Sequence, residues 1–186
     1  MTDDDEPLLT LEPLIEAVQD GITRSGWVLS GLQKTTSHQF EGRWQGESSR
    51  SAYLFFHADT RPDSVSIDVY LDETTKGLKG NLALVVNGPE LGLLEPMSDL
   101  LTALAEVTAD CLPEQYDTPF VVRLRMDGPG DDPRTADTEV RIKLTIPSEA
   151  LSAGSSAVSA LASATAAAFE RALEHEGLRS SLTEAG

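Results

Sequence analysis

The stretch "SVSIDVYLD" (residues 64–72) alternates polar and apolar side chains over most of its length. Its aliphatic residues fall on every second position: Val65, Ile67, Val69 and Leu71. A period of two places such residues on one face of a β-strand, because successive side chains point to opposite sides of a sheet. A strand that is apolar on one face is typical of an antiparallel sheet with one side in water. This stretch therefore predicts a sheet that is covered on one side.

Further strands are predicted on both sides of this stretch. They span residues 27–36, 38–46, 51–59 and 79–88, and later residues 120–126 and 138–146. Turn sequences such as "TRPD" and "ETTKG" separate neighbouring strands of the first group. Because short connections join strands that lie side by side, this group predicts an antiparallel meander.

Two segments with helical spacing lie before and after this group of strands. The first has Thr10 as its expected N-cap and Gly26 beyond its end. The second falls within residues 95–113 and carries Cys111 on its apolar stripe. We therefore expect Cys111 to be a buried structural thiol.

A third helix is predicted from about residue 148 to residue 176, with Gly177 directly beyond its end. Its sequence is mostly alanine and serine. Small side chains let a helix lie close to a sheet or to another helix, so we expect tight packing along much of its length. A helix-pairing surface in a homodimer is the alternative interpretation.

The resulting order is helix, four or five strands, helix, two strands, helix. It predicts an α+β fold, in which helices gather on one face of an antiparallel meander sheet. We expect an acidic disordered tail at residues 1–9, one α+β domain over residues 10–177 and a disordered tail at residues 178–186. In element order alone, the chain broadly resembles type III secretion chaperone-like and YbjN-like domains, although it has more strands before the second helix than the three expected there. That resemblance implies a small acidic protein that acts by binding other proteins.

The charge is strongly negative, with 31 acidic and 14 basic residues giving a formal net charge of −17. A polyanion meets long-range repulsion from such a chain, so free nucleic acid is not an expected partner. Only four of the basic residues are lysines. This balance is typical of proteins adapted to high salt, and equally of acidic proteins from GC-rich genomes.

The beginning of the chain, "MTDDDEPLL", has no basic region followed by an apolar run, so no signal peptide is expected. No window approaches the roughly 18 consecutive apolar residues of a membrane-spanning helix. These observations predict a cytoplasmic protein without a membrane partner.

The stretch "EGRWQGESSRSAYLFFHAD" (residues 41–59) collects three serines, His57 and Asp59. A nucleophilic triad needs a serine beside the histidine and an oxyanion hole, and no GxSxG motif is present here. We interpret the stretch as a β-hairpin whose aromatic side chains pack across the strands: Trp44, Tyr53 and Phe55. The sequence also lacks a phosphate-binding glycine motif and a zinc-binding cysteine cluster. It predicts no catalytic residue, no metal site and no cofactor.

Basic residues occupy the polar positions of the last two predicted strands. They are Arg123, Arg125, Arg141 and Lys143. One loop joins the two strands, so we expect these bases next to one another on the outer face of the sheet. Two interpretations remain open. The bases pair with Glu139, Asp68 or Asp72 on neighbouring strands, or they bind an acidic protein segment or a small anion.

Two classes of function follow from these features. The first is a non-enzymatic protein-binding module or chaperone-like adaptor, whose partner is another protein or an acidic segment and which forms a homodimer. The second is a small-ligand binding protein or enzyme with a pocket between the sheet and the long C-terminal helix. The lack of a catalytic motif favours the first class, and the four basic residues are its predicted binding site.

Overall fold

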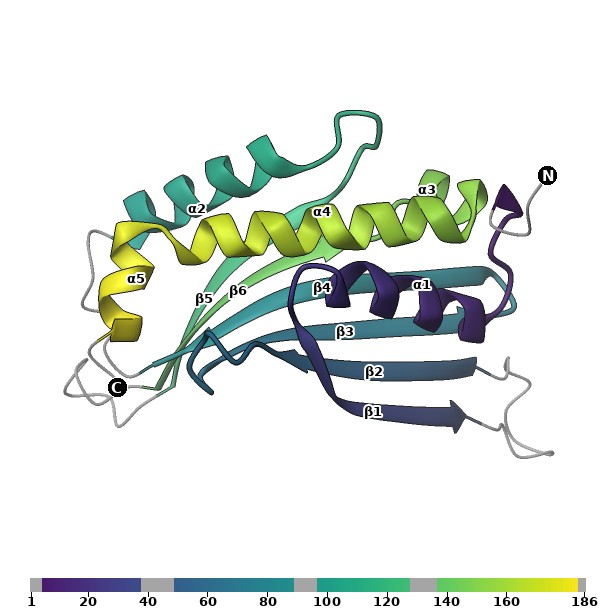
Figure 1. Ribbon diagram of the computed structural model, residues 1–186, viewed down its shortest axis with the longest axis horizontal. Helices are drawn as coiled ribbons and strands as arrows, with labels where there is room; N and C mark the ends of the chain where they lie inside the picture. Colours follow the sequence, from purple (N-terminus) through teal and green to yellow (C-terminus); the bar gives the residue numbers. More distant parts are fainter. Residues whose placement is uncertain (1–4, 38–48, 89–96, 128–136, 184–186) are drawn as a thin grey trace.

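The computed structural model describes residues 5–37, 49–88, 97–127 and 137–183 (Figure 1). Within them the chain forms one antiparallel sheet with a layer of helices on one face. The elements are α1 (Leu11–Thr23), β1 (Val28–Ser37), β2 (Ser49–His57), β3 (Val65–Thr74), β4 (Gly77–Asn87), α2 (Met97–Cys111), β5 (Phe120–Asp127), β6 (Asp137–Thr145), α3 (Ser148–Ala153), α4 (Ser155–Leu173) and α5 (Glu176–Thr183). The predicted α+β fold, with helices on one face of the sheet, is confirmed. The strand predicted at residues 38–46 lies outside the described residues.

The six strands have the order β1-β2-β3-β4-β6-β5. The first four follow one another, and each pairs antiparallel with the next. Helix α2 then leads to the last hairpin, whose second strand, β6, pairs with β4. Strand β5 pairs with β6 and is therefore the edge strand opposite β1.

The core lies between the sheet and the helices. The four aliphatic residues of β3 are at most 2% exposed, as their period of two predicts. Strand β4 departs from this alternation, because every residue from Leu82 to Val86 is buried. It lies at the centre of the sheet between β3 and β6, where neighbouring side chains cover its outer positions as well.

Helix α4 lies in the middle of the helix layer, with α1 on one side and α2 on the other (Figure 1). Its small residues allow a very close approach to α1. A Cβ atom added at Gly21 of α1 would lie 2.2 Å from the carbonyl oxygen of Ser159 and 2.7 Å from the Cβ of Ala162. The alanine- and serine-rich sequence thus serves helix packing within the chain.

Helix α2 buries a narrower stripe than the sequence predicts. Leu100, Leu104 and Thr108 are fully buried, and the Thr108 hydroxyl donates to the carbonyl oxygen of Leu104 at 2.7 Å. Cys111 was expected to be buried and is only half-buried, because it is the last residue of the helix.

The prediction of one continuous helix over residues 148–176 is wrong. Gly154 separates α3 from α4 and has a φ of 102°, a region that glycine adopts without the cost paid by other residues. Helix α4 ends at Leu173, and α5 begins at Glu176. Gly177 therefore lies inside α5, where an added Cβ would come within 3.0 Å of the Leu100 side chain.

The described parts of both predicted tails, residues 5–9 and 178–183, contact the folded domain. The backbone N–H of Leu8 donates to the carbonyl oxygen of Leu151 at 2.9 Å, and its side chain packs against the core. At the other end, α5 continues to Thr183 and Leu178 is fully buried. Full burial of a leucine side chain such as Leu178 stabilises a fold by about 1.5–3 kcal/mol, which favours an ordered backbone there.

Candidate functional site

The candidate site is the open face of the sheet, by which we mean the face opposite the helix layer (Figure 1). Side chains reach it from alternate positions of each strand. Two regions of this face differ in chemistry. Strands β5 and β6 contribute basic residues, and β2 and β3 contribute aromatic residues.

We call Arg123, Arg125, Arg141 and Lys143 the basic patch. In the register of β5 and β6, Arg123 stands opposite Arg141, Arg125 opposite Glu139 and Lys143 opposite Val121. Residues directly opposite each other in an antiparallel pair project to the same face. The register therefore places all four bases on the open face.

Two members of the basic patch are paired within the chain. The Nε of Arg141 donates to Glu139 Oε1 at 3.0 Å, and its Nη2 lies 3.9 Å from Asp68 Oδ2. Arg141 thus reaches over β4, which separates β6 from β3. Arg125 forms an ion pair with Asp127, and the hydrogen bond that its guanidinium donates to this carboxylate raises the pKa of Arg125 above its ordinary value.

The other two members, Arg123 and Lys143, have no carboxylate within 4 Å among the residues that the structure describes. Arg123 is exposed and Lys143 is half-buried. Asp72 was an expected partner, but it accepts a hydrogen bond from the Ser51 hydroxyl at 2.8 Å. Arg123 and Lys143 therefore give the open face a local positive charge in a chain with a net charge of −17.

Small apolar residues of β4 lie beneath the basic patch. Ala83 and Val85 occupy open-face positions but are only 2% and 3% exposed. Ala83 stands opposite Lys143 and Val85 opposite Arg141. Long basic side chains lie along apolar surface while their charged ends stay in water, which explains this burial. The charged groups of the basic patch thus lie above apolar side chains of β4.

The aromatic region consists of Tyr53, Phe55 and Tyr70. Tyr53 and Phe55 on β2 are 37% and 38% exposed. The rings of Tyr53 and Tyr70 are tilted by 48°, with their centroids 5.0 Å apart. The sequence predicts Tyr53 and Phe55 only as packing partners within a hairpin. The alternation of β2 carries the missing signal, because it places both residues on the face opposite buried Leu54.

The structure separates the residues of the serine, histidine and aspartate stretch. Ser51 and His57 project to the same face of β2, but six residues of extended strand hold them about 20 Å apart. Asp59 lies beyond the end of the strand and is exposed. These described residues therefore do not form a nucleophilic triad.

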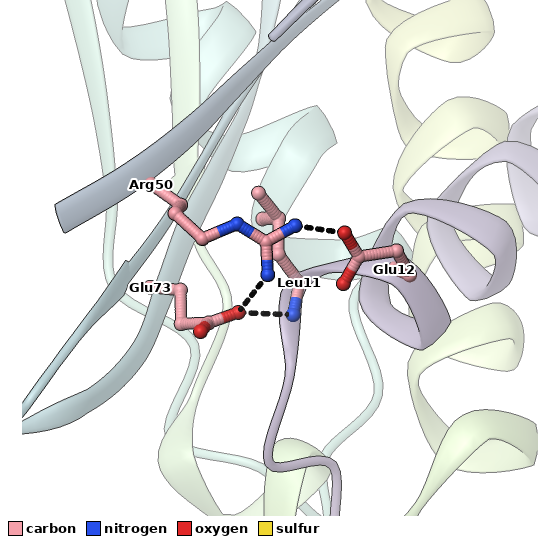
Figure 2. A network of polar contacts seen from close by, with 4 residues as sticks. All are labelled: Leu11, Glu12, Arg50 and Glu73. Carbon is pink, nitrogen blue, oxygen red and sulfur yellow. Dashed lines mark hydrogen bonds and ion pairs between the residues drawn. The ribbon is translucent and has the colours of Figure 1, made fainter. Parts of the chain in front are cut away.

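A second polar cluster joins helix α1 to the sheet on its helix-covered side (Figure 2). Arg50 of β2 forms ion pairs with Glu12 of α1 and with Glu73 of β3, the latter at 3.5 Å. Glu73 Oε2 also accepts the backbone N–H of Leu11 at 2.6 Å. The Arg50 hydrogen bond lowers the pKa of Glu12, and the same bond raises the pKa of Arg50. Because these groups satisfy one another, we assign the cluster a role in holding α1 on the sheet.

The second class of function requires a pocket between the sheet and α4. The large apolar residues of α4 are at most 2% exposed there: Val158, Leu161, Phe169 and Leu173. Two grooves on the described part of the chain lie elsewhere, one between α1 and the beginning of α4 and the other between α2 and β5. Neither lies at the predicted place, so the ligand-binding interpretation stays a prediction.

Comparisons of the chain with family models, with curated proteins and with solved structures gave no match. None of the described helices is both long and apolar enough to cross a membrane.

Proposed function

We propose that this chain is a protein-binding module that holds an acidic segment of another protein on the open face of its sheet. Arg123 and Lys143 would contact the acidic side chains, and the exposed aromatic rings of β2 would contact apolar ones. The proposal includes the cytoplasmic location inferred from the sequence. A chaperone-like or adaptor role is one form that such binding takes.

One observation carries this proposal. Arg123 and Lys143 lack a carboxylate partner among the described residues, although acidic residues outnumber basic ones by 31 to 14. The two other bases of the patch do have partners, so the open face offers acids for internal pairing. Charge-assisted hydrogen bonds from an arginine to a carboxylate are about twice as strong as neutral ones, which makes Arg123 a suitable anchor for an acidic segment.

The open face also provides apolar contact. Tyr53 and Phe55 of β2 are exposed. Val121 of β5 is 41% exposed and stands opposite Lys143 of β6. Aromatic residues and arginine are enriched in protein interfaces relative to the rest of the protein surface. A partner segment with both acidic and apolar side chains would therefore fit this face better than an inorganic anion.

Selection from a displayed library of random peptides tests the proposal. The bait is the full chain, and the comparison bait carries Arg123→Glu and Lys143→Glu. A matched control carries Lys76→Glu and Arg171→Glu, two exposed bases outside the open face that give the same change in net charge. We expect the wild type and the control to enrich acidic peptides that also contain apolar residues.

The comparison bait should lose this enrichment while its melting temperature stays close to that of the wild type. Enrichment that is equal on all three baits would overturn the proposal. Enrichment of basic peptides, or none at all on a folded wild type, would overturn it as well.

A further inference from the structure

The free edge of β5 offers unpaired backbone groups. The backbone N–H of Thr145 on β6 donates to the carbonyl oxygen of Pro119, directly before β5, at 2.8 Å. Hydrogen-bonded and non-hydrogen-bonded positions alternate along an antiparallel pair. The backbone N–H and C=O groups of Val121 and Arg123 therefore form hydrogen bonds with β6. The backbone groups of the alternate positions point to the free edge: Phe120, Val122 and Leu124. No strand of the described part of the chain pairs with that side.

The side chains of β5 divide in the same way. Arg123 and Arg125 project to the open face, whereas Phe120, Val122 and Leu124 project toward the helices. These three apolar residues are only half-buried, in contrast to the fully buried residues of β2 and β3. An open groove runs between β5 and α2, where Leu101 and Ala105 face Phe120 and Val122. The apolar layer thus continues to the edge of the sheet.

We infer that the partner segment binds as a seventh strand, paired with the free edge of β5. This inference rests on the proposed function and specifies how the part of the segment beside Arg123 is held. The aromatic rings of β2 lie four strands away in the sheet and would contact another part of the partner. The side chains of the added strand would alternate, with acidic residues toward Arg123 on the open face and apolar residues toward the groove beside α2. The backbone supplies affinity in this mode, and the alternating side chains supply specificity.

Charge distinguishes such a segment from a second copy of the chain. A twofold axis through the edge would pair β5 with its own copy and keep the two faces of the sheet separate. Each open-face residue of β5 would then stand opposite another member of the same set, which is Val121, Arg123, Arg125 and Asp127. With the twofold axis at Arg123 or Leu124, the middle of the strand, arginine stands opposite arginine. Like charges directly opposite each other destabilise a sheet, and charged residues on edge strands prevent self-pairing. A strand with acidic residues at these positions would instead place opposite charges beside the arginines, which stabilises the pair of strands.

Amide hydrogen exchange measured by NMR tests the inference on the unmodified chain. The probe is a soluble peptide of alternating glutamate and valine, about nine residues long to match a short strand. We expect the amides of Val122 and Leu124 to exchange more slowly when the peptide is added. The amide of Arg123, which already bonds to β6, should change little. A peptide of alternating lysine and valine should protect none of them.

A pair of variants adds an independent readout. Val122→Pro and Val122→Ala both remove the valine side chain, but only proline removes the N–H that faces the free edge. Proline is tolerated at such edge positions because no hydrogen bond of the sheet is lost. We expect Val122→Pro to bind the glutamate–valine peptide about five- to tenfold more weakly than Val122→Ala.

The outcomes separate this inference from the proposed function. Binding that Arg123→Glu with Lys143→Glu abolishes, without slower exchange at Val122, would overturn strand addition and leave docking on the open face. Peptide binding insensitive to all of these variants would overturn both. Failure of the peptide to bind the folded chain would overturn strand addition alone, since the library selection judges the proposed function separately. Slow exchange at Val122 without peptide, in a dimer, would assign this edge to a second copy and overturn the inference.

Discussion

The carboxylate of Glu73 on β3 accepts a hydrogen bond from the backbone N–H of Leu11, the first residue of α1, at 2.6 Å. Thr10 occupies the N-cap position that the sequence predicts, but its side chain makes no capping hydrogen bond. Glu73, which is 62 positions away in the sequence, therefore caps the helix in place of the Thr10 side chain. A negative charge at this place also interacts favourably with the helix dipole.

Removal of this distant cap should destabilise the fold. We expect Glu73→Ala to lower the free energy of unfolding by about 1–2 kcal/mol, the range for loss of a helix cap and of a hydrogen bond to a charged group. Thr10→Ala should change it by only a few tenths, although Thr10 is the residue that the sequence marks as the cap. Urea denaturation of both variants measures the difference. A larger effect at Thr10 would contradict our assignment.

The Glu12–Arg50 pair should make stability depend on acidic pH. Its hydrogen bond lowers the pKa of Glu12 in the folded state below the ordinary value of 4.5. A lowered carboxyl pKa contributes stability above the unfolded-state pKa, and this contribution is lost as the pH falls through the folded-state pKa. The melting temperature of Glu12→Gln should thus fall below that of the wild type at neutral pH, and the two should converge as the pH falls below the ordinary value and through the folded-state pKa of Glu12.

Glu16→Gln is the matched control for this experiment, since Glu16 is exposed on the same helix and has no ion pair with a described residue. Its melting temperature should follow that of the wild type at every pH. A constant difference between Glu12→Gln and the wild type would show that the pair does not titrate as we expect.

The contact at Gly21 should tolerate no side chain. Alanine favours a helix over glycine by about 1 kcal/mol, so an exposed glycine replaced by alanine would stabilise α1. At Gly21 the added Cβ would lie 2.2 Å from the Ser159 carbonyl oxygen, and we expect a net loss of about 1–3 kcal/mol from overpacking. Ala162→Gly should not rescue Gly21→Ala, because the nearest atom belongs to the backbone. A more stable Gly21→Ala variant would show that α1 and α4 lie farther apart.

Salt should raise the melting temperature. The net charge of −17 implies self-repulsion, which concentrated KCl screens. We expect the midpoint in about 2 M KCl to exceed the midpoint in dilute buffer, where the Debye length is several times longer. Potassium glutamate in place of KCl distinguishes ion-specific effects from screening. Equal midpoints at both salt concentrations would remove the interpretation of a protein adapted to high salt.

The regular part of the fold could be predicted because its signal is local. The alternation of Val65, Ile67 and Val69 specifies a half-covered strand without knowledge of its neighbours. The cap of α1 could not be found in this way, since it depends on the distance between Glu73 and Leu11 in the folded chain. The sequence does not show the break at Gly154, because alanine and serine continue the helical composition on both sides of it.

The candidate site was predictable only in part for a similar reason. Periodicity places Arg123 and Arg141 on one face, but it does not say which strand lies beside β6. Because β6 pairs with β4, Arg141 can reach Asp68 on β3 while Arg123 remains at the edge. The sequence alone therefore does not distinguish Arg123 from Arg141. The strand order makes Arg141 a structural residue and leaves Arg123 as a candidate contact for a partner.

The position of Arg123 and Lys143 in so acidic a chain has a kinetic consequence. An acidic segment that approaches from a distance meets the repulsion of the whole molecule, and it meets the attraction of these two bases only at close range. At physiological ionic strength the Debye length is about 8 Å, so added salt removes the distant repulsion before it weakens the contact. The association rate constant should then rise with ionic strength, pass through a maximum and fall, whereas an ordinary pair of opposite charges shows only the fall. Such a protein would select its partners by the ionic strength of its surroundings as well as by their sequence.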